Sequence, residues 1–145
     1  MQTAVQTTFP KPAATQATWY AVSAKDQVLG VVAARVARVL MGKHRVDYTP
    51  SVDLGDHVVV TDAAAVAVSG RKEKDKVYRY HTGYAGGLKE VTLGRMRREK
   101  PEQIIKLAVK RMLPKNRLGK QMLEKLRVYP GPEHQQAAQK PQPLP

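Results

Sequence analysis

The run His57-Val58-Val59-Val60-Thr61 constrains the fold of this chain more than any other feature. A strand with one face in water alternates apolar and polar residues, because successive side chains point to opposite faces. Three successive valines therefore predict a strand that is covered on both faces. Such strands are typical of the parallel sheets of α/β proteins.

The segments around this strand predict a strand–helix–strand order. Residues 19–22 are aromatic and β-branched, which favours a first strand. Residues 28–42 predict a helix that stops at Gly42, because their apolar side chains recur at helical spacing. Residues 66–68 predict another short strand. Together these elements indicate an α/β body with a mainly parallel sheet.

The second half of the chain predicts further short elements. Residues 76–81 form a candidate strand, and a glycine-rich loop follows at 82–87. Thr92 is a suitable cap for a short helix through Arg98. A clearer helix is expected over 101–112, because proline favours the first helical turn. A last helix is expected over about 118–126.

The two ends differ in composition from the middle. Residues 1–18 are rich in Ala, Thr, Gln and Pro and predict a flexible leader. Residues 130–145 hold five prolines and four glutamines and predict an extended tail. We therefore expect a single α/β domain over 19–129, with disordered tails.

Positive charge is concentrated in one part of the chain. The formal net charge of the 145 residues is +13. Residues 1–70 carry six basic and five acidic side chains, whereas residues 71–127 carry 18 basic and six acidic ones. Such asymmetry indicates a folded body that presents a surface to a polyanion. The alternative is a set of solvated helix faces, but these usually carry compensating glutamates.

Several classes of protein are excluded or disfavoured. The chain has no cysteine, which excludes disulfide scaffolds, thiolate metal sites and cysteine nucleophiles. The longest apolar run, 28–34, is too short to span a membrane. Gly42-Lys43 lacks the spacing of a phosphate-binding loop, and no histidine pair suits a metal. We expect neither a cofactor, a metal nor a small-molecule substrate.

Basic and aromatic residues are interleaved within the basic segment 71–127. Cations bind phosphates, and aromatic rings stack on unpaired bases, which RNA offers in its loops and bulges. For the tyrosines the alternative role is core packing, and for any single lysine it is a solvated helix face. The candidate RNA-binding residues are Lys43, His44, Arg45, Arg71, Lys72, Lys74, Lys76, Tyr78, Arg79, His81, Gly83, Gly86, Arg95, Arg97, Arg98, Lys110, Arg111, Lys115, Arg117 and Lys120.

Short blocks of sequence stand in a characteristic order from about Trp19 to Gln139, and each is modest when taken alone. The blocks include Trp19-Tyr20, Gly42-Lys43-His44, Tyr48-Thr49-Pro50, Lys76-Val77-Tyr78, His81-Thr82-Gly83, Met112-Leu113-Pro114-Lys115 and Leu118-Gly119. Together and in this order, they resemble the L-thirteen family of bacterial large-subunit ribosomal proteins. Val31 and Arg111 depart from the family pattern, which usually has arginine and glycine at these positions.

The resemblance implies a fold, a function and partners. The fold would be a three-layer α/β/α body with a four-stranded parallel sheet. The protein would be a structural, non-enzymatic component of the cytoplasmic ribosome that binds large-subunit ribosomal RNA, contacts neighbouring ribosomal proteins and joins early in assembly. The residues in matching blocks that would contact RNA are Lys43, His44, Lys76, Tyr78, His81, Gly83, Gly86, Lys110 and Lys115.

Two other functions fit the composition less well. A small α/β enzyme acting on a phosphorylated ligand would use the glycine loop, but it needs an acid–base pair or nucleophile that the sequence does not offer. A DNA-binding protein would need an element that reads a groove, and no such motif is recognisable.

Overall fold

Four parallel strands form the central sheet. The computed structural model describes residues 9–10 and 17–144. The strands are β1 (Trp19–Ser23), β2 (His57–Thr61), β5 (Leu126–Val128) and β6 (Gln142–Pro143). Their order across the sheet is β5-β2-β1-β6, and every neighbouring pair is parallel. The expected α/β class with a four-stranded parallel sheet is confirmed, and it is consistent with three layers.

Strand β2 is covered on both faces, as its three valines predicted. Val58, Val59 and Val60 are each 0% exposed, although Val59 points to the opposite face from its neighbours. Val58 and Val60 join the main hydrophobic core. This strand therefore anchors the body of the protein.

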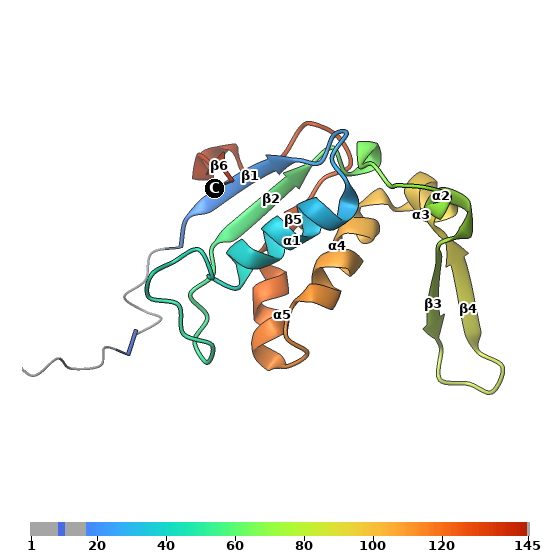
Figure 1. The fold of residues 1–145 in the computed structure, drawn as a ribbon, viewed down its shortest axis with the longest axis horizontal. Coiled ribbons are helices and arrows are strands. Elements are labelled where there is room, and N and C mark those ends of the chain that lie inside the picture. Colours follow the sequence, from blue (N-terminus) through green and yellow to red (C-terminus); the bar gives the residue numbers. More distant parts are fainter. Residues whose placement is uncertain (1–8, 11–16, 145) are drawn as a thin grey trace, which may run out of the picture.

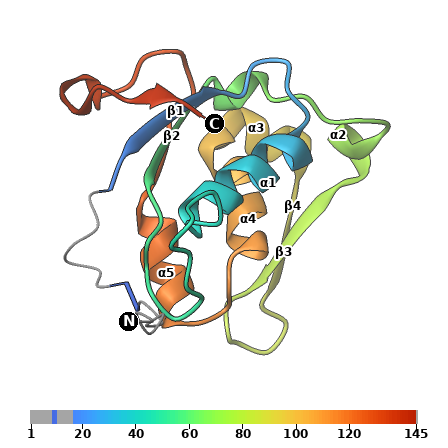
Figure 2. The same cartoon turned by 60° about the vertical axis from the view of Figure 1, so that its left-hand side comes forward.

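Three helices pack beside the sheet in Figure 2: α1 (Leu29–Leu40), α4 (Pro101–Met112) and α5 (Arg117–Glu124). The predicted helical spacing over 28–42 is confirmed, and Gly42 follows α1 with a left-handed φ of 78°. Proline opens α4, as expected. The helices contribute Leu40, Ile104 and Ile105, among others, to the core.

A β-hairpin projects from this body, as Figure 1 shows. It consists of β3 (Val77–His81) and β4 (Leu88–Thr92), which pair antiparallel. Two short helices lie at its base, α2 (Lys72–Asp75) and α3 (Leu93–Glu99). The Thr92 hydroxyl accepts a hydrogen bond from the backbone N–H of Arg95, which confirms the predicted cap.

The predicted strand over 66–68 is wrong. Val66 and Ala67 form only isolated bridges, Val66 with Lys25 and Ala67 with Val28. A 3₁₀ turn, η2 (Ala63–Ala65), precedes them and carries the chain away from the sheet. The side chain of Val66 is nevertheless 0% exposed. The apolar pattern here reflected burial in the core and not strand pairing.

Three strands were not predicted, namely β4, β5 and the C-terminal strand β6. Strand β4 lacks the alternation of apolar and polar residues that predicts a strand. Four of its five residues are exposed, so it has no buried face that would require such a pattern. Strand β5 begins at Leu126, a residue that was predicted to end the last helix. Leu126 continues the apolar spacing of α5, so a local pattern cannot separate the two elements.

The C-terminal segment lies along the sheet instead of forming a disordered tail. Strand β6 pairs with β1, and the N–H of Leu144 donates to the carbonyl of Ala21 at 3.2 Å. A 3₁₀ turn, η3 (Ala137–Gln139), precedes β6. The edge position suits Pro143, because proline has no N–H for a further strand.

Most of the predicted leader, residues 1–8 and 11–16, lies outside the described residues. Within the part of the chain that the structure describes, no helix is long and apolar enough to cross a membrane.

Candidate nucleic-acid interface

Most of the predicted RNA-binding cations are exposed. They lie just after α1, on α2 and its N-cap, on the hairpin, on α3, and from the end of α4 into α5. The exposed cations among the candidates are Lys43, Arg71, Lys72, Lys74, Arg79, Arg95, Arg98, Lys110, Arg111, Lys115, Arg117 and Lys120. Most of the positive charge among the candidate residues thus faces solvent, where a polyanion can reach it.

Three of the predicted arginines in segment 71–127 have carboxylate partners. Arg79 pairs with Glu90 across the hairpin, and Arg95 pairs with Glu99 along α3. Both pairs are exposed, so they contribute little to stability. Arg97 differs, because it contacts Glu73 at 3.0 Å and the carbonyl of Ala64 at 3.3 Å. Its contacts tie α3 to α2 and to the body.

A cationic cluster surrounds Tyr78. The Lys76 ammonium lies 5.3 Å from the centre of the Tyr78 ring, and the Arg111 guanidinium lies 6.0 Å from it. Burial lowers the pKa of Lys76, and the positive charges of Arg111 and Lys72 lower it further. An anion at this cluster would relieve that repulsion. Burial also raises the pKa of the Tyr78 hydroxyl.

The hairpin separates two tyrosines that share a strand face. Tyr78 is 6% exposed and packs in the core, whereas Tyr80 is 59% exposed and Tyr84 is 78% exposed. The RNA-binding residues predicted from the sequence include Tyr78 but neither Tyr80 nor Tyr84. The alternation of side chains along a strand places Tyr78 and Tyr80 on the same face of β3. Which of the two is buried depends on how close each lies to the body of the protein.

The glycine loop is an ordered turn at the tip of the hairpin. Gly83 and Gly86 have left-handed φ values of 93° and 68°, which favour glycine. The carbonyl of Gly87 accepts from the N–H of Thr82 at 3.0 Å. His81 is exposed, and its Nδ1 accepts from the N–H of Gly83 at 3.0 Å.

Two residues after α1 turn towards the protein interior. His44 Nε2 lies 2.7 Å from an oxygen of Asp56, whose side chain is 1% exposed. The other oxygen of Asp56 accepts from the N–H of Thr18 at 2.7 Å. Arg45 contacts Asp47 at 3.1 Å and Asp56 at 3.7 Å. His44 and Arg45 therefore fasten the loop 43–56 to β1, while Lys43 remains exposed.

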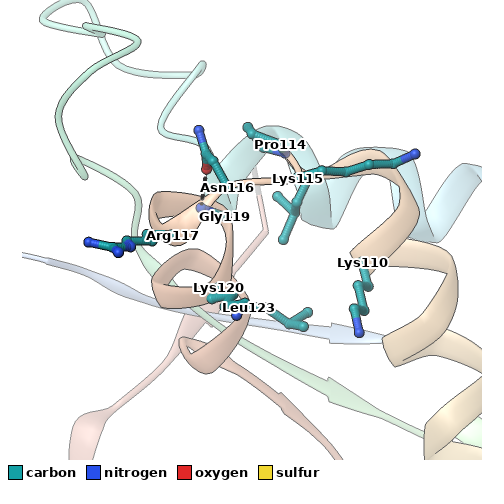
Figure 3. A pocket seen from close by; sticks show the side chains of 9 residues that line it. Lys110, Pro114, Lys115, Asn116, Arg117, Gly119, Lys120 and Leu123 are labelled. Atoms are coloured by element: carbon teal, nitrogen blue, oxygen red, sulfur yellow. Dashed lines mark hydrogen bonds between the residues drawn. The ribbon is translucent and has the colours of Figure 1, made fainter. Parts of the chain in front are cut away.

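A pocket of about 370 Å³ lies at the turn between α4 and α5 (Figure 3). Its cationic lining residues are Lys110, Lys115, Arg117 and Lys120. Leu113, Pro114 and Leu123 supply apolar surface, and no described acidic residue lines it.

The described residues form no group of three or more His, Asp or Glu side chains that could hold a metal ion. The fold and the surface together define a small α/β protein whose main chemical feature is an extended cationic surface.

Comparison with known proteins identifies the family. The family described as "Ribosomal protein L13" matches residues 17–135. "Large ribosomal subunit protein uL13" of Thermotoga petrophila is 52% identical over 96% of this chain and 93% of that protein. The proteins of the same name from Methylococcus capsulatus and Solibacter usitatus are 52% and 53% identical over 92% and 94% of the chain, and 94% and 96% of their own lengths.

The chain therefore belongs to the ribosomal protein L13 family. The resemblance found in the sequence is confirmed. The protein is a structural ribosomal protein and not an enzyme, and its place is the ribosome.

Proposed function

We propose that this protein binds large-subunit ribosomal RNA through the exposed cations of segment 71–127. The observation that carries the proposal is the lack of compensating charge. Lys74, Arg98 and Lys110 are exposed and form no ion pair with any described residue. Phosphates would supply that charge and release counterions from the RNA, a gain that favours binding.

Exposed tyrosines would add contacts to bases. Tyr80 and Tyr84 lie on a hairpin that projects from the body (Figure 1). A projecting two-stranded ribbon gains little from its own packing, so a partner surface would hold it in place. Aromatic side chains stack on unpaired bases, which ribosomal RNA offers in loops and bulges.

The body of the protein would position this cationic surface and would contact neighbouring ribosomal proteins.

We also propose that the protein supports early assembly of the subunit, because a surface that neutralises phosphates lets RNA segments approach one another. Omitting the protein from a stepwise reconstitution of the subunit should stall assembly at an early particle. Normal progress without it would contradict the assembly role alone.

A pair of charge-removal variants tests RNA binding. The first replaces Arg71, Lys74 and Arg98 with alanine, and the matched control replaces Lys25, Arg35 and Arg38, which are equally exposed but lie in the electrically balanced half. Affinity for a large-subunit rRNA transcript is measured between 50 and 200 mM salt. With roughly six to ten phosphate contacts, the wild type should lose about 10³–10⁵-fold in affinity across that range.

The first variant should bind more weakly and show a flatter salt dependence, because each lost phosphate contact lowers the log–log slope by about 0.7–0.9. The control should stay near wild type. Equal losses in the two variants, or a flat salt dependence of the wild type, would contradict the proposed interface.

A further inference from the structure

The pocket between α4 and α5 combines a cationic rim with an apolar floor. Leu113 is only 4% exposed, and Leu123 is half-buried beside it. A phosphate gains nothing from such a floor, because an anion loses hydration against apolar groups. A nucleobase does gain, because its flat faces are poorly hydrated and stack or pack well.

We infer that this pocket binds one unpaired nucleotide of RNA, with the base on the apolar floor and the adjoining phosphates on the cationic rim. The inference rests on the proposed function and deepens it. It names a subsite for a single nucleotide within a surface that otherwise neutralises phosphates.

The charge of the rim fits the phosphates on either side of a nucleotide. Lys110 comes from α4, Lys115 from the turn, and Arg117 and Lys120 from α5, so both helices and the turn contribute cations to the lining (Figure 3). None of these four forms an ion pair within the described part of the chain. The N-terminal end of α5, which carries a partial positive charge, adds to the same field.

The size of the pocket favours a single base. Its volume of about 370 Å³ lies near the lower end for small-molecule sites. A base inside a duplex is stacked and paired, so its faces cannot reach a floor of this kind. An unpaired base in a loop or bulge has its faces free.

The pocket is built before any ligand arrives. The side chain of Asn116 accepts from the N–H of Gly119 at 2.8 Å and fixes the start of α5. The N–H of Leu113 donates to the carbonyl of Val109 at 3.1 Å and fixes the end of α4. A preformed site loses little conformational entropy on binding, which raises affinity for a small ligand.

A polar variant of the full-length protein tests the inference. Leu123→Gln puts an amide into the apolar floor without adding a ring that could stack on a base, and it leaves all four cations in place. The matched control is Val46→Gln, because Val46 is fully exposed and lies outside the pocket. Affinity for single-stranded hexauridylate and for a 12-base-pair RNA duplex is measured across a salt series.

Leu123→Gln should weaken hexauridylate binding about 5- to 150-fold, the range expected from losing one base contact. Its salt slope and its affinity for the duplex should match those of the control. Unchanged hexauridylate binding in a folded Leu123→Gln protein would overturn the inference.

A second measurement needs no substitution. In methyl NMR spectra of the wild type, hexauridylate should shift the methyl signals of Leu113 and Leu123, and inorganic phosphate alone should not. Binding of hexauridylate without methyl shifts would overturn the nucleotide subsite and leave the proposed RNA binding standing. Failure to bind either RNA would overturn the proposed function itself.

Discussion

The turn between α4 and α5 depends on the absence of a side chain at Gly119. A Cβ atom at this position would lie 1.9 Å from the carbonyl oxygen of Pro114. That oxygen belongs to the backbone and cannot move without displacing the turn. The pocket therefore owes its shape to one close approach of two chain segments.

We expect Gly119→Ala to lower the free energy of unfolding by roughly 1–3 kcal/mol, the usual cost of forcing atoms into a packed site. Gly30→Ala is the matched control, because Gly30 lies in α1 and a Cβ there meets nothing within 4 Å. That variant should gain roughly 0.5–1 kcal/mol from helix propensity. Urea denaturation measures both, and equal effects of the same sign would contradict the steric explanation.

His57 should make stability depend on pH. Its ring stacks on Trp19 at 4.3 Å between centroids. Burial lowers the pKa of His57, the positive charges of Lys125 and Arg127 lower it further, and Asp56 and Asp53 oppose the shift. The unfolded chain therefore binds a proton at a higher pH than the folded chain does.

The contribution of His57 to stability is fully present above the pKa of histidine in the unfolded chain, about 6.5. It is lost as the pH falls from there through the lower pKa of His57 in the folded protein. Melting temperatures at pH 7.5 and pH 5.5 test this. The wild type should lose more stability on acidification than His57→Gln, whose side chain does not titrate. Identical pH profiles would show that His57 does not contribute.

At the scale of elements, the hairpin β3–β4 separates a buried tyrosine from two exposed ones. Tyr78 lies against the body at the base, and Tyr80 and Tyr84 extend into solvent. The same residue type thus occupies two environments within seven positions, because only the side chain at the base of the hairpin meets the body.

Replacing Tyr80 and Tyr84 with alanine should weaken binding to rRNA by about 1–3 kcal/mol per stacked base and leave the melting temperature nearly unchanged. Tyr78→Ala should instead destabilise the fold by roughly 3–5 kcal/mol, because it leaves a cavity in the core. Filter binding and thermal denaturation separate the two effects. A large loss of stability in the double variant would contradict a binding role.

The loop 43–56 depends on a buried carboxylate. Asp56 receives hydrogen bonds from the backbone of Thr18 and the ring of His44, both at 2.7 Å. Asp56→Ala should cost roughly 1–3 kcal/mol, because it leaves these buried donors without an acceptor. Denaturant titration measures the loss, and Asp47→Ala, which removes a far more exposed carboxylate, should cost less. Equal costs would argue against the buried anchor.

At the scale of the whole molecule, a net charge of +13 opposes compaction. Salt screens such repulsion, with a Debye length of about 10 Å at 0.1 M. We therefore expect the melting temperature to rise between 50 and 300 mM sodium chloride, while RNA affinity falls across the same range. Scanning calorimetry of the free protein checks this, and a melting temperature that falls with salt would contradict self-repulsion.

The sequence by itself determined the class of the fold and the location of the charge. The valines of β2, the spacing in α1 and the proline that opens α4 are local patterns, and each predicted its element correctly. The asymmetry between 1–70 and 71–127 needs only a count of charges. These patterns can be predicted from the sequence because each depends only on residues that are close to one another along the chain.

Only the tertiary structure decided which side chains are free. His44 faces a carboxylate twelve residues away, Arg97 contacts a carbonyl 33 residues away, and Tyr78 is covered while Tyr80 is not. Strand β6 pairs with β1 from the other end of the chain. The exposure of a side chain and the pairing of a strand depend on which distant segments of the chain come into contact. The periodicity of the sequence does not contain that information.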